Sequence, residues 1–148
     1  MLYHYTTGHN FVKIIQSHAL LPMPLGNELE GERVAVWFSS NDYWEPTAQK
    51  AIKNTVMDEW HLLGMKGTAK LGGGLFRFKV SRKNSKIMGF NDFARTSSLP
   101  ERFISGLKKE GRKQGGRYYQ WFASYDPVAS EDWLGIETWK DDKWVPID

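Results

Sequence analysis

Short segments that alternate apolar and polar residues lie at the start and in the middle of the chain, and they constrain its fold more than any other feature. Residues 2–6 (Leu-Tyr-His-Tyr-Thr) and 75–80 (Leu-Phe-Arg-Phe-Lys-Val) alternate as half-buried strands do. Further strands are predicted at residues 34–40, 118–125, 133–139 and 144–147, the last two as a hairpin. Because strands begin and end the chain, we predict one α+β domain over residues 1–148 with a largely antiparallel sheet.

Two or three helices are predicted between the strands, over residues 9–18, 46–63 and from residue 98 onward. Thr7 or Gly8 caps the first of these helices, and Pro46 fits the first turn of the second. A short helical turn is also expected at residues 90–94. Residues 65–74 contain four glycines and are expected to form a loop, which we interpret as a connection because it precedes a strand and lacks the spacing of a phosphate-binding loop.

The composition excludes several classes of chemistry. There is no cysteine, so disulfides, thiolate metal sites and a thiol nucleophile are excluded. The N-terminus has no basic segment followed by an apolar one, and no apolar run approaches the length of a membrane span, so we expect a cytoplasmic protein with no membrane partner. The formal net charge of +3 permits an anionic ligand but does not establish nucleic-acid binding.

No metal site is predicted, because the four histidines are scattered and no pair of them has ligand spacing. A serine hydrolase is not indicated either, since the sequence has no Gly-x-Ser-x-Gly motif. A glycosidase needs two carboxylates in one cleft, and a sequence with 17 acidic residues neither supports nor excludes that arrangement.

Residues 108–117 are basic and rich in glycine. The cations of this segment are Lys108, Lys109, Arg112, Lys113 and Arg117, with only Glu110 against them. The segment is either a solvated helix end with its loop or an electrostatic site for phosphates or a polynucleotide. Both interpretations stay open, because the sequence shows no aromatic platform among the cations.

Polar and aromatic residues occupy comparable places on three predicted strands. Leu2 and Tyr5 are expected near the core, with His4 and Thr6 together on the opposite face, at the mouth of a strand-to-helix turn where free backbone N–H groups can hold a ligand. Trp37 and Ser39 follow on the second strand, and Gln120 lies on a third. Considered alone, these residues have preferred structural interpretations: His4 as a satisfied, partly buried histidine, Trp37 as a core tryptophan and Gln120 as an exposed strand residue.

The order of these residues resembles the ADP-ribosyltransferase superfamily, in its His–Tyr–Glu branch. This branch includes the poly- and mono-ADP-ribose polymerases, the RNA 2′-phosphotransferases, the rifampicin ADP-ribosyltransferases and the DarT-type DNA toxins. Residues 2–6 are similar to the first motif of the family, a His followed two residues later by Ser or Thr. Residues 35–40 (Ala-Val-Trp-Phe-Ser-Ser) resemble the second motif, and residues 119–128 resemble the third, in which a Glu usually opens the strand.

The resemblance implies that the chain binds NAD as a substrate within a split β-sheet core. His4 would hydrogen-bond a ribose of NAD, and Thr6 would help to hold the nicotinamide amide. Trp37 stands where the family has Tyr and would offer a flat face to the nicotinamide ring, while Ser39 would line the same pocket. Arg33, which precedes the second motif, would meet the pyrophosphate as a bidentate donor.

The same resemblance implies a departure from the family at its third motif. Tyr43 or Trp44 would close the pocket by stacking, and Gln120 stands where the family usually has Glu. A Gln accepts a hydrogen bond but carries no charge and is no base, which puts strong catalysis and chain elongation in doubt. Asp92 and Glu137 are the alternative candidates for the acidic role.

The sequence therefore predicts an NAD-dependent mono-ADP-ribosyltransferase of toxin or modifying-enzyme type, with His4 and Gln120 as the candidate catalytic residues. It would release nicotinamide and transfer ADP-ribose to a protein, nucleic-acid or small-molecule acceptor. Two alternatives remain: a catalytically weak module of the same fold that binds NAD, ADP-ribose or a protein, and a nucleic-acid-modifying enzyme that uses residues 108–117.

Overall fold

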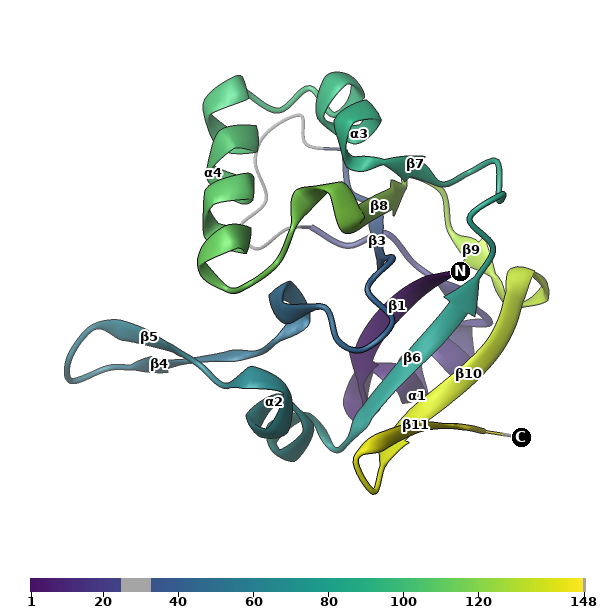
Figure 1. Cartoon of the computed structure of the whole chain (residues 1–148), viewed down its shortest axis with the longest axis horizontal. Helices are drawn as coiled ribbons and strands as arrows, with labels where there is room; N and C mark the ends of the chain where they lie inside the picture. Colours follow the sequence, from purple (N-terminus) through teal and green to yellow (C-terminus); the bar gives the residue numbers. More distant parts are fainter. Residues whose placement is uncertain (25–32, 148) are drawn as a thin grey trace.

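A seven-stranded sheet crosses the whole molecule (Figure 1). The computed structural model describes residues 1–24 and 33–147. The strands of this sheet are β1 Leu2–Thr7, β3 Val36–Ser39, β6 Leu75–Val80, β7 Met88–Gly89, β8 Trp121–Ser124, β10 Trp133–Lys140 and β11 Lys143–Pro146. Their order is β11-β10-β6-β1-β3-β8-β7, and every neighbouring pair is antiparallel. The predicted α+β class with a largely antiparallel sheet is confirmed.

Four α-helices accompany the sheet in the described residues, rather than the two or three predicted. The helices are α1 Gly8–Ser17, α2 Gly64–Gly72, α3 Phe90–Thr96 and α4 Glu101–Lys113, and short 3-10 turns occur at Pro46–Ala48, Tyr118–Gln120 and Ser130–Asp132. Two further strand pairs lie outside the main sheet: β2 Ala19–Leu20 with β9 Val128–Ala129, and β4 Ala51–Asn54 with β5 Glu59–Leu62.

The helices cover different parts of the sheet. Helix α1 packs Phe11 and Ile14 against a core that includes Leu2, Phe38 and Phe78. Helices α3 and α4 lie over β3 and β8 at the other end of the molecule (Figure 1), and they contribute to a second core around Trp121. The two cores cover opposite faces of the sheet, so apolar residues appear on both sides of the central strands.

Strand β1 is covered on both faces, which corrects one prediction. Leu2 belongs to the core under α1, whereas Tyr5 belongs to a third core with Trp44 and Leu75. The ring of His4 lies 5.9 Å from that of Phe38, on the same side as Leu2. The expectation that His4 faces away from Leu2 is therefore wrong, because alternate residues of a strand share a face.

The join between β1 and β3 is narrow. These two strands share a single register pair, Tyr3 with Ser39, whereas β1 pairs with β6 at six positions from Leu2 to Thr7. The hydrogen-bonded sheet is continuous across this join. The candidate site lies beside this narrow join.

Three predicted elements are wrong. The helix predicted over residues 46–63 is a 3-10 turn followed by the β4–β5 hairpin, which projects away from the body (Figure 1). The segment predicted as a loop, residues 65–74, is largely helix α2. Gly72 of this helix lies against Thr7, and a Cβ added at Gly72 would come within 2.4 Å of the threonine side chain. The strand predicted from residue 118 begins only at Trp121, after a 3-10 turn.

We expect the β4–β5 hairpin to contribute little to stability. Its apolar side chains are exposed, with Val56 at 91% and Trp60 at 66% of their full accessible surface. Replacing residues 53–60 by a short Gly-Ser turn should change the free energy of unfolding by less than about 1 kcal/mol, because exposed positions carry little packing energy. Urea denaturation measures this, with Leu75→Ala as the core control, expected to lose about 2–5 kcal/mol. A loss as large as that of the control would show that the hairpin supports the core.

Candidate functional site

A cavity of about 600 Å³ lies beside the narrow join of β1 and β3. Both of these strands contribute to its lining, as do the segment from Glu45 to Lys50, helix α4 and the first residue of β8, Trp121. The lining mixes aromatic rings with carboxylate, hydroxyl and amide groups. Such a combination is typical of a site for a small ligand or cofactor, in which apolar walls supply contact area and a few polar groups fix the orientation.

The carboxylate of Glu45 is the most distinctive polar group of this cavity. Glu45 is 6% exposed, and its two oxygens accept three hydrogen bonds. Oε1 accepts from Ser39 Oγ at 2.7 Å, and Oε2 accepts from Thr47 Oγ1 at 2.7 Å and from Thr47 N–H at 3.1 Å. A carboxylate has about four acceptor positions. One position on Oε1 therefore remains for a ligand, and no Lys or Arg of the described residues forms a salt bridge with Glu45.

The local sequence fixes Glu45 in this position. Ser39 ends β3, and its hydroxyl accepts from Asn41 N–H at 3.1 Å while it donates to Glu45. The side chain of Asn41 accepts from Tyr43 N–H at 3.0 Å, which turns the chain back toward the cavity. Glu45 then caps the 3-10 turn that begins at Pro46. A side-chain acceptor at a cap followed by a proline is a favourable helix start, so the same contacts form the turn and orient the carboxylate.

Aromatic rings form the wall on the side of α3 and β8. Trp37, Phe90 and Trp121 all line the cavity, and the rings of Phe90 and Trp121 meet edge to face at 5.2 Å. The indole N–H groups of Trp37 and Trp121 are enclosed and have no hydrogen-bond partner among the described residues. A buried donor without a partner costs about 1–3 kcal/mol. The wall therefore holds two donors that the described part of the fold leaves unsatisfied.

Gly111 allows α4 to approach this wall closely. A Cβ at Gly111 would lie 2.3 Å from Cη2 of Trp121, which no side chain can tolerate without a shift. Helix α4 therefore rests directly on the indole, and its residues Leu107 and Glu110, with Gln114 just after its end, reach the cavity lining. One glycine thus sets the distance between the helix and the aromatic wall.

His4 connects the two strands at the narrow join. Its Nδ1 lies 2.7 Å from the backbone oxygen of Trp37. Because a carbonyl only accepts, Nδ1 carries the proton, and Nε2 is the unprotonated nitrogen of the neutral ring. Burial lowers the pKa of His4 below its usual value, and the hydrogen bond to Trp37 opposes this only in part. His4 also belongs to the cavity lining, so it serves as a strand connector at the edge of the site.

The buried, neutral state of His4 predicts a pH dependence of stability. In the unfolded chain its pKa returns to about 6.5, so below this pH the unfolded state takes up a proton that the folded state refuses. Stability should therefore fall as the pH decreases from about 6.5 toward the lower folded-state pKa, by up to about 1.4 kcal/mol per pH unit. His4→Gln keeps a donor for the Trp37 carbonyl and should remove this component. Urea unfolding of both proteins at pH 7.5, 6.5 and 5.5 measures the difference; parallel profiles would contradict the assignment.

The structure brings only part of the predicted site together. His4, Trp37 and Ser39 all line the cavity. Thr6 and Trp44 lie outside the lining, and Trp44 is buried in the core beside Tyr5, with the two rings 5.4 Å apart. Arg33 also lies outside it, with its guanidinium 3.7 Å above the ring of Tyr125.

The predicted candidates for the acidic position lie away from the cavity. Gln120 is in the 3-10 turn before β8, where its backbone oxygen accepts from Ser40 N–H at 2.9 Å, and the next residue, Trp121, takes the place in the lining. Asp92 is exposed on α3 and paired with Arg95 at 2.9 Å. Glu137 lies on β10. Sequence reasoning missed Glu45, although an acidic residue directly before a helix-starting proline is a signal for a cap.

Three further findings bear on the function of the chain. In residues 1–24 and 33–147 no group of three or more His, Asp or Glu side chains is placed to hold a metal ion. No helix in the same residues has the length and apolar character needed to cross a membrane. Comparisons of the chain with protein-family models, with curated proteins and with solved structures gave no match. The interpretation of the cavity therefore rests on its own chemistry.

Proposed function

We propose that the cavity binds the nicotinamide–ribose half of NAD and that the protein is a mono-ADP-ribosyltransferase in which Glu45 takes the acidic role. The observation that carries this proposal is the carboxylate of Glu45, buried in an aromatic cavity, hydrogen-bonded by three neutral donors and without a salt-bridge partner among the described residues. A negative charge held in this way favours a ligand that is cationic or becomes cationic during reaction.

The chemistry of NAD matches this requirement. The bond between the pyridinium nitrogen of nicotinamide and C1′ of the ribose breaks, and its electron pair leaves with nicotinamide, which becomes neutral. The positive charge passes to the ribose, which becomes oxocarbenium-like. An oxygen or nitrogen of the acceptor then forms the new bond to C1′ and loses a proton. A fixed carboxylate close to the ribose stabilises the charge at the moment when it develops, which is where catalysis requires it.

The remaining groups of the cavity fit the same ligand. The free acceptor position on Glu45 Oε1 suits a ribose hydroxyl, and the ring of Trp37 offers a flat surface to nicotinamide. In this arrangement Ser39 acts as a positioning residue, because its hydroxyl orients the carboxylate.

A second candidate function is binding of NAD or ADP-ribose without turnover. It is favoured by the position of Gln120, which lies outside the cavity, so that the third motif of the resembled family supplies no polar side chain to the site. The ring of His4 is also engaged in joining β1 to β3. A module of this kind would use the same aromatic wall and the same carboxylate for recognition alone.

A titration with NAD separates the two functions. Tryptophan fluorescence of the purified chain reports binding, because two indoles line the cavity, and chromatography of the same samples measures free nicotinamide. We expect saturable quenching together with nicotinamide release, and weaker quenching in Trp37→Phe. Quenching without release would support the binding module. If NAD changes neither signal, both candidate functions are wrong.

A further inference from the structure

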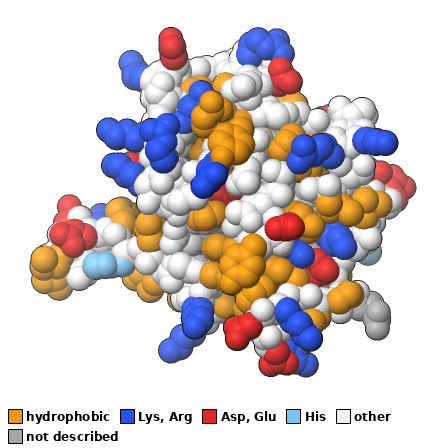
Figure 2. Space-filling view, in the orientation of Figure 1, with side chains coloured by type: hydrophobic (Ala, Val, Ile, Leu, Met, Phe, Trp, Pro, Cys, Tyr) orange, Lys and Arg blue, Asp and Glu red, His pale blue; other side chains and the backbone are white. Residues whose placement is uncertain are grey.

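The positive charge of the chain is concentrated at one place. Residues 108–117 carry five cations and one acid, a net charge of +4, whereas the whole chain has a formal net charge of +3. All other residues together are therefore slightly acidic, with a net charge of −1. Figure 2 shows blue side chains gathered at the upper left, over the position of α4 in Figure 1.

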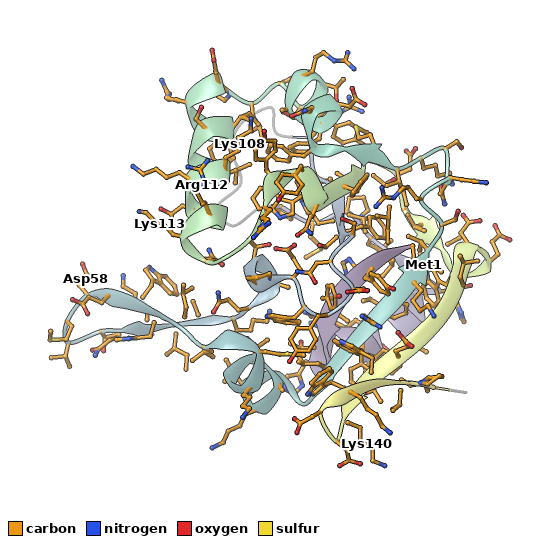
Figure 3. All side chains as sticks on the ribbon, viewed as in Figure 1. Met1, Asp58, Lys108, Arg112, Lys113 and Lys140 are labelled. Atoms are coloured by element: carbon orange, nitrogen blue, oxygen red, sulfur yellow. The ribbon has the colours of Figure 1, made fainter. Side chains whose placement is uncertain are left out.

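The cations of this segment are open to solvent. Lys109, Arg112, Lys113 and Arg117 are exposed, and Lys108 is partly buried. Lys108, Arg112 and Lys113 extend from the same helix, α4 (Figure 3). Of the five cations of this segment, only Lys113 forms an ion pair with a described residue, Glu110 at 3.2 Å, and both partners are more than half exposed. An exposed pair of this kind is weak, so nearly the full charge is available to a ligand.

The fold also places aromatic rings beside these cations, which the sequence did not reveal. Tyr118 and Tyr119 form the 3-10 turn that follows α4. The ammonium of Lys108 lies 4.3 Å from the ring centre of Tyr118, and Arg117 donates to the hydroxyl of Tyr119 at 3.0 Å. Tyr119 is 62% exposed. An exposed ring held among cations is the arrangement that binds single-stranded nucleic acids, whose phosphates meet the cations and whose bases stack on the ring.

This basic surface adjoins the cavity. Leu107, Gly111 and Gln114 of the α4 segment line the cavity, and Lys108 and Arg112 are the next residues along the chain from two of them. Trp121, which forms the aromatic wall, comes two residues after Tyr119. Residues of one helix therefore contribute both to the basic surface and to the lining of the cavity that contains Glu45.

From this arrangement we infer that the acceptor is a single-stranded nucleic acid, held by the α4 surface, which we define as Lys108, Lys109, Arg112, Lys113, Arg117 and Tyr119. The inference rests on the proposed function in so far as it names the acceptor; binding by the α4 surface is independent of it. An oxygen or nitrogen atom of a base, or an oxygen atom of a sugar, then serves as the nucleophile toward C1′ of the ribose.

Two simpler explanations account for only part of this surface. Cations in the last turn of a helix are favoured by its dipole, which explains Arg112 and Lys113 but not Lys108 or Arg117. The pyrophosphate of NAD offers one pair of phosphates, and two or three cations satisfy it. A surface of five cations with an exposed tyrosine is suited to a longer series of phosphates.

Fluorescence anisotropy with a labelled twelve-nucleotide oligo-dT measures the binding. The test variant is the triple substitution Lys109→Gln, Arg112→Gln, Lys113→Gln, in which no residue of the cavity lining is changed. The matched control removes the same charge from exposed lysines elsewhere, by Lys66→Gln, Lys70→Gln and Lys140→Gln. We expect the test variant to bind at least 10-fold more weakly at 50 mM NaCl and the control to change less than 3-fold. The slope of log K against log salt should fall by about 2, since each lost phosphate contact on a single strand contributes about 0.7.

Further arms of the same experiment identify the ligand. Tyr119→Ala should weaken binding by at least about 5-fold, because stacking contributes about 1–3 kcal/mol per base, with the exposed Tyr43→Ala as its control. Duplex DNA of the same length, polyglutamate and NAD are the competitors. Equal losses in test and control variants, or displacement by polyglutamate or NAD as effective as by unlabelled oligo-dT, would overturn the inference.

The two proposals fail separately. Nicotinamide release by the triple variant should match that of the unchanged protein, because its substitutions lie outside the cavity lining. Oligonucleotide binding without any response to NAD would retain the α4 surface and remove the transferase. Nicotinamide release without oligonucleotide binding would retain the proposed function and remove the nucleic-acid acceptor.

Discussion

Glu45→Gln is expected to lower the rate of nicotinamide release from NAD by about 10²–10³-fold, the usual effect of removing one electrostatic group that stabilises a transition state. The amide keeps the size of the side chain and one acceptor oxygen, so the cap of the 3-10 turn can persist. It loses the negative charge that, in the proposed reaction, stabilises the developing ribose cation. Initial rates of nicotinamide formation at saturating NAD measure the effect.

Glu110→Gln is the matched control for this prediction, because Glu110 is a second carboxylate of the cavity lining and is exposed. We expect it to change the rate by less than about 3-fold, since an exposed charge is screened by solvent. Circular dichroism of both variants checks that the fold is kept. If Glu110→Gln has the larger effect, the acidic role belongs to α4 and not to the cap of the 3-10 turn.

Glu137→Ala is expected to lower the free energy of unfolding by about 3–5 kcal/mol, the cost of leaving a buried charge without its partner. The partner is Arg77, whose side chain is 8% exposed and whose Nη2 lies 2.7 Å from Glu137 Oε1. The guanidinium also lies between the rings of Tyr3 and Trp144, at 4.2 Å and 4.5 Å from their centres. This cluster ties β11 and β10 to β6 and β1, so its loss weakens the sheet on one side of the cavity.

Urea denaturation at pH 7 measures this effect against an exposed ion pair of the same chain. Lys53→Ala breaks the pair with Asp58, whose partners are 46% and 83% exposed, and should cost about 0–1 kcal/mol. The double substitution Arg77→Met, Glu137→Met should recover much of the loss, because no unpaired charge is left inside. Equal losses for Glu137→Ala and Lys53→Ala would show that the burial of the Arg77 pair has no energetic consequence.

The strands that were predicted correctly pack against a core on at least one face. Strand β6 is covered on both, by the core of Phe78 and Val80 and by that of Leu75, and the predicted bounds match it residue for residue. The hairpin of β4 and β5 has no such face, since most of its side chains are exposed, so its sequence follows no alternation. Ala48, Ala51, Ile52 and Val56 instead suggested a helix by spacing alone.

Helix α2 was missed for the opposite reason. Its glycines predicted a loop, yet Gly72 is present because α2 lies directly against Thr7 of β1. A glycine required by close packing cannot be distinguished from a glycine of a flexible loop without knowledge of the neighbouring element. Such contacts between distant parts of the chain are the information that local patterns lack.

The candidate site was predictable to a similar extent. His4, Trp37 and Ser39 lie on strands that meet at the narrow join, and their order along the chain indicated a shared pocket. Glu45 was missed because it follows the strand in an irregular segment, where the sequence does not specify the direction of a side chain. Its orientation depends on hydrogen bonds from Ser39 and Thr47, which only the folded chain supplies.

The projecting hairpin has a practical consequence for work on this protein. Each of its two strands has one edge without a hydrogen-bonding neighbour among the described strands, and Ile52, Trp60 and Leu62 are exposed beside these edges. Open edges with apolar side chains favour sheet extension between molecules, so concentrated samples should self-associate through this segment. A shortened hairpin that carries a charged turn is therefore the preferred form for co-crystallisation with NAD, and the tip of the hairpin is the natural point for attaching a label.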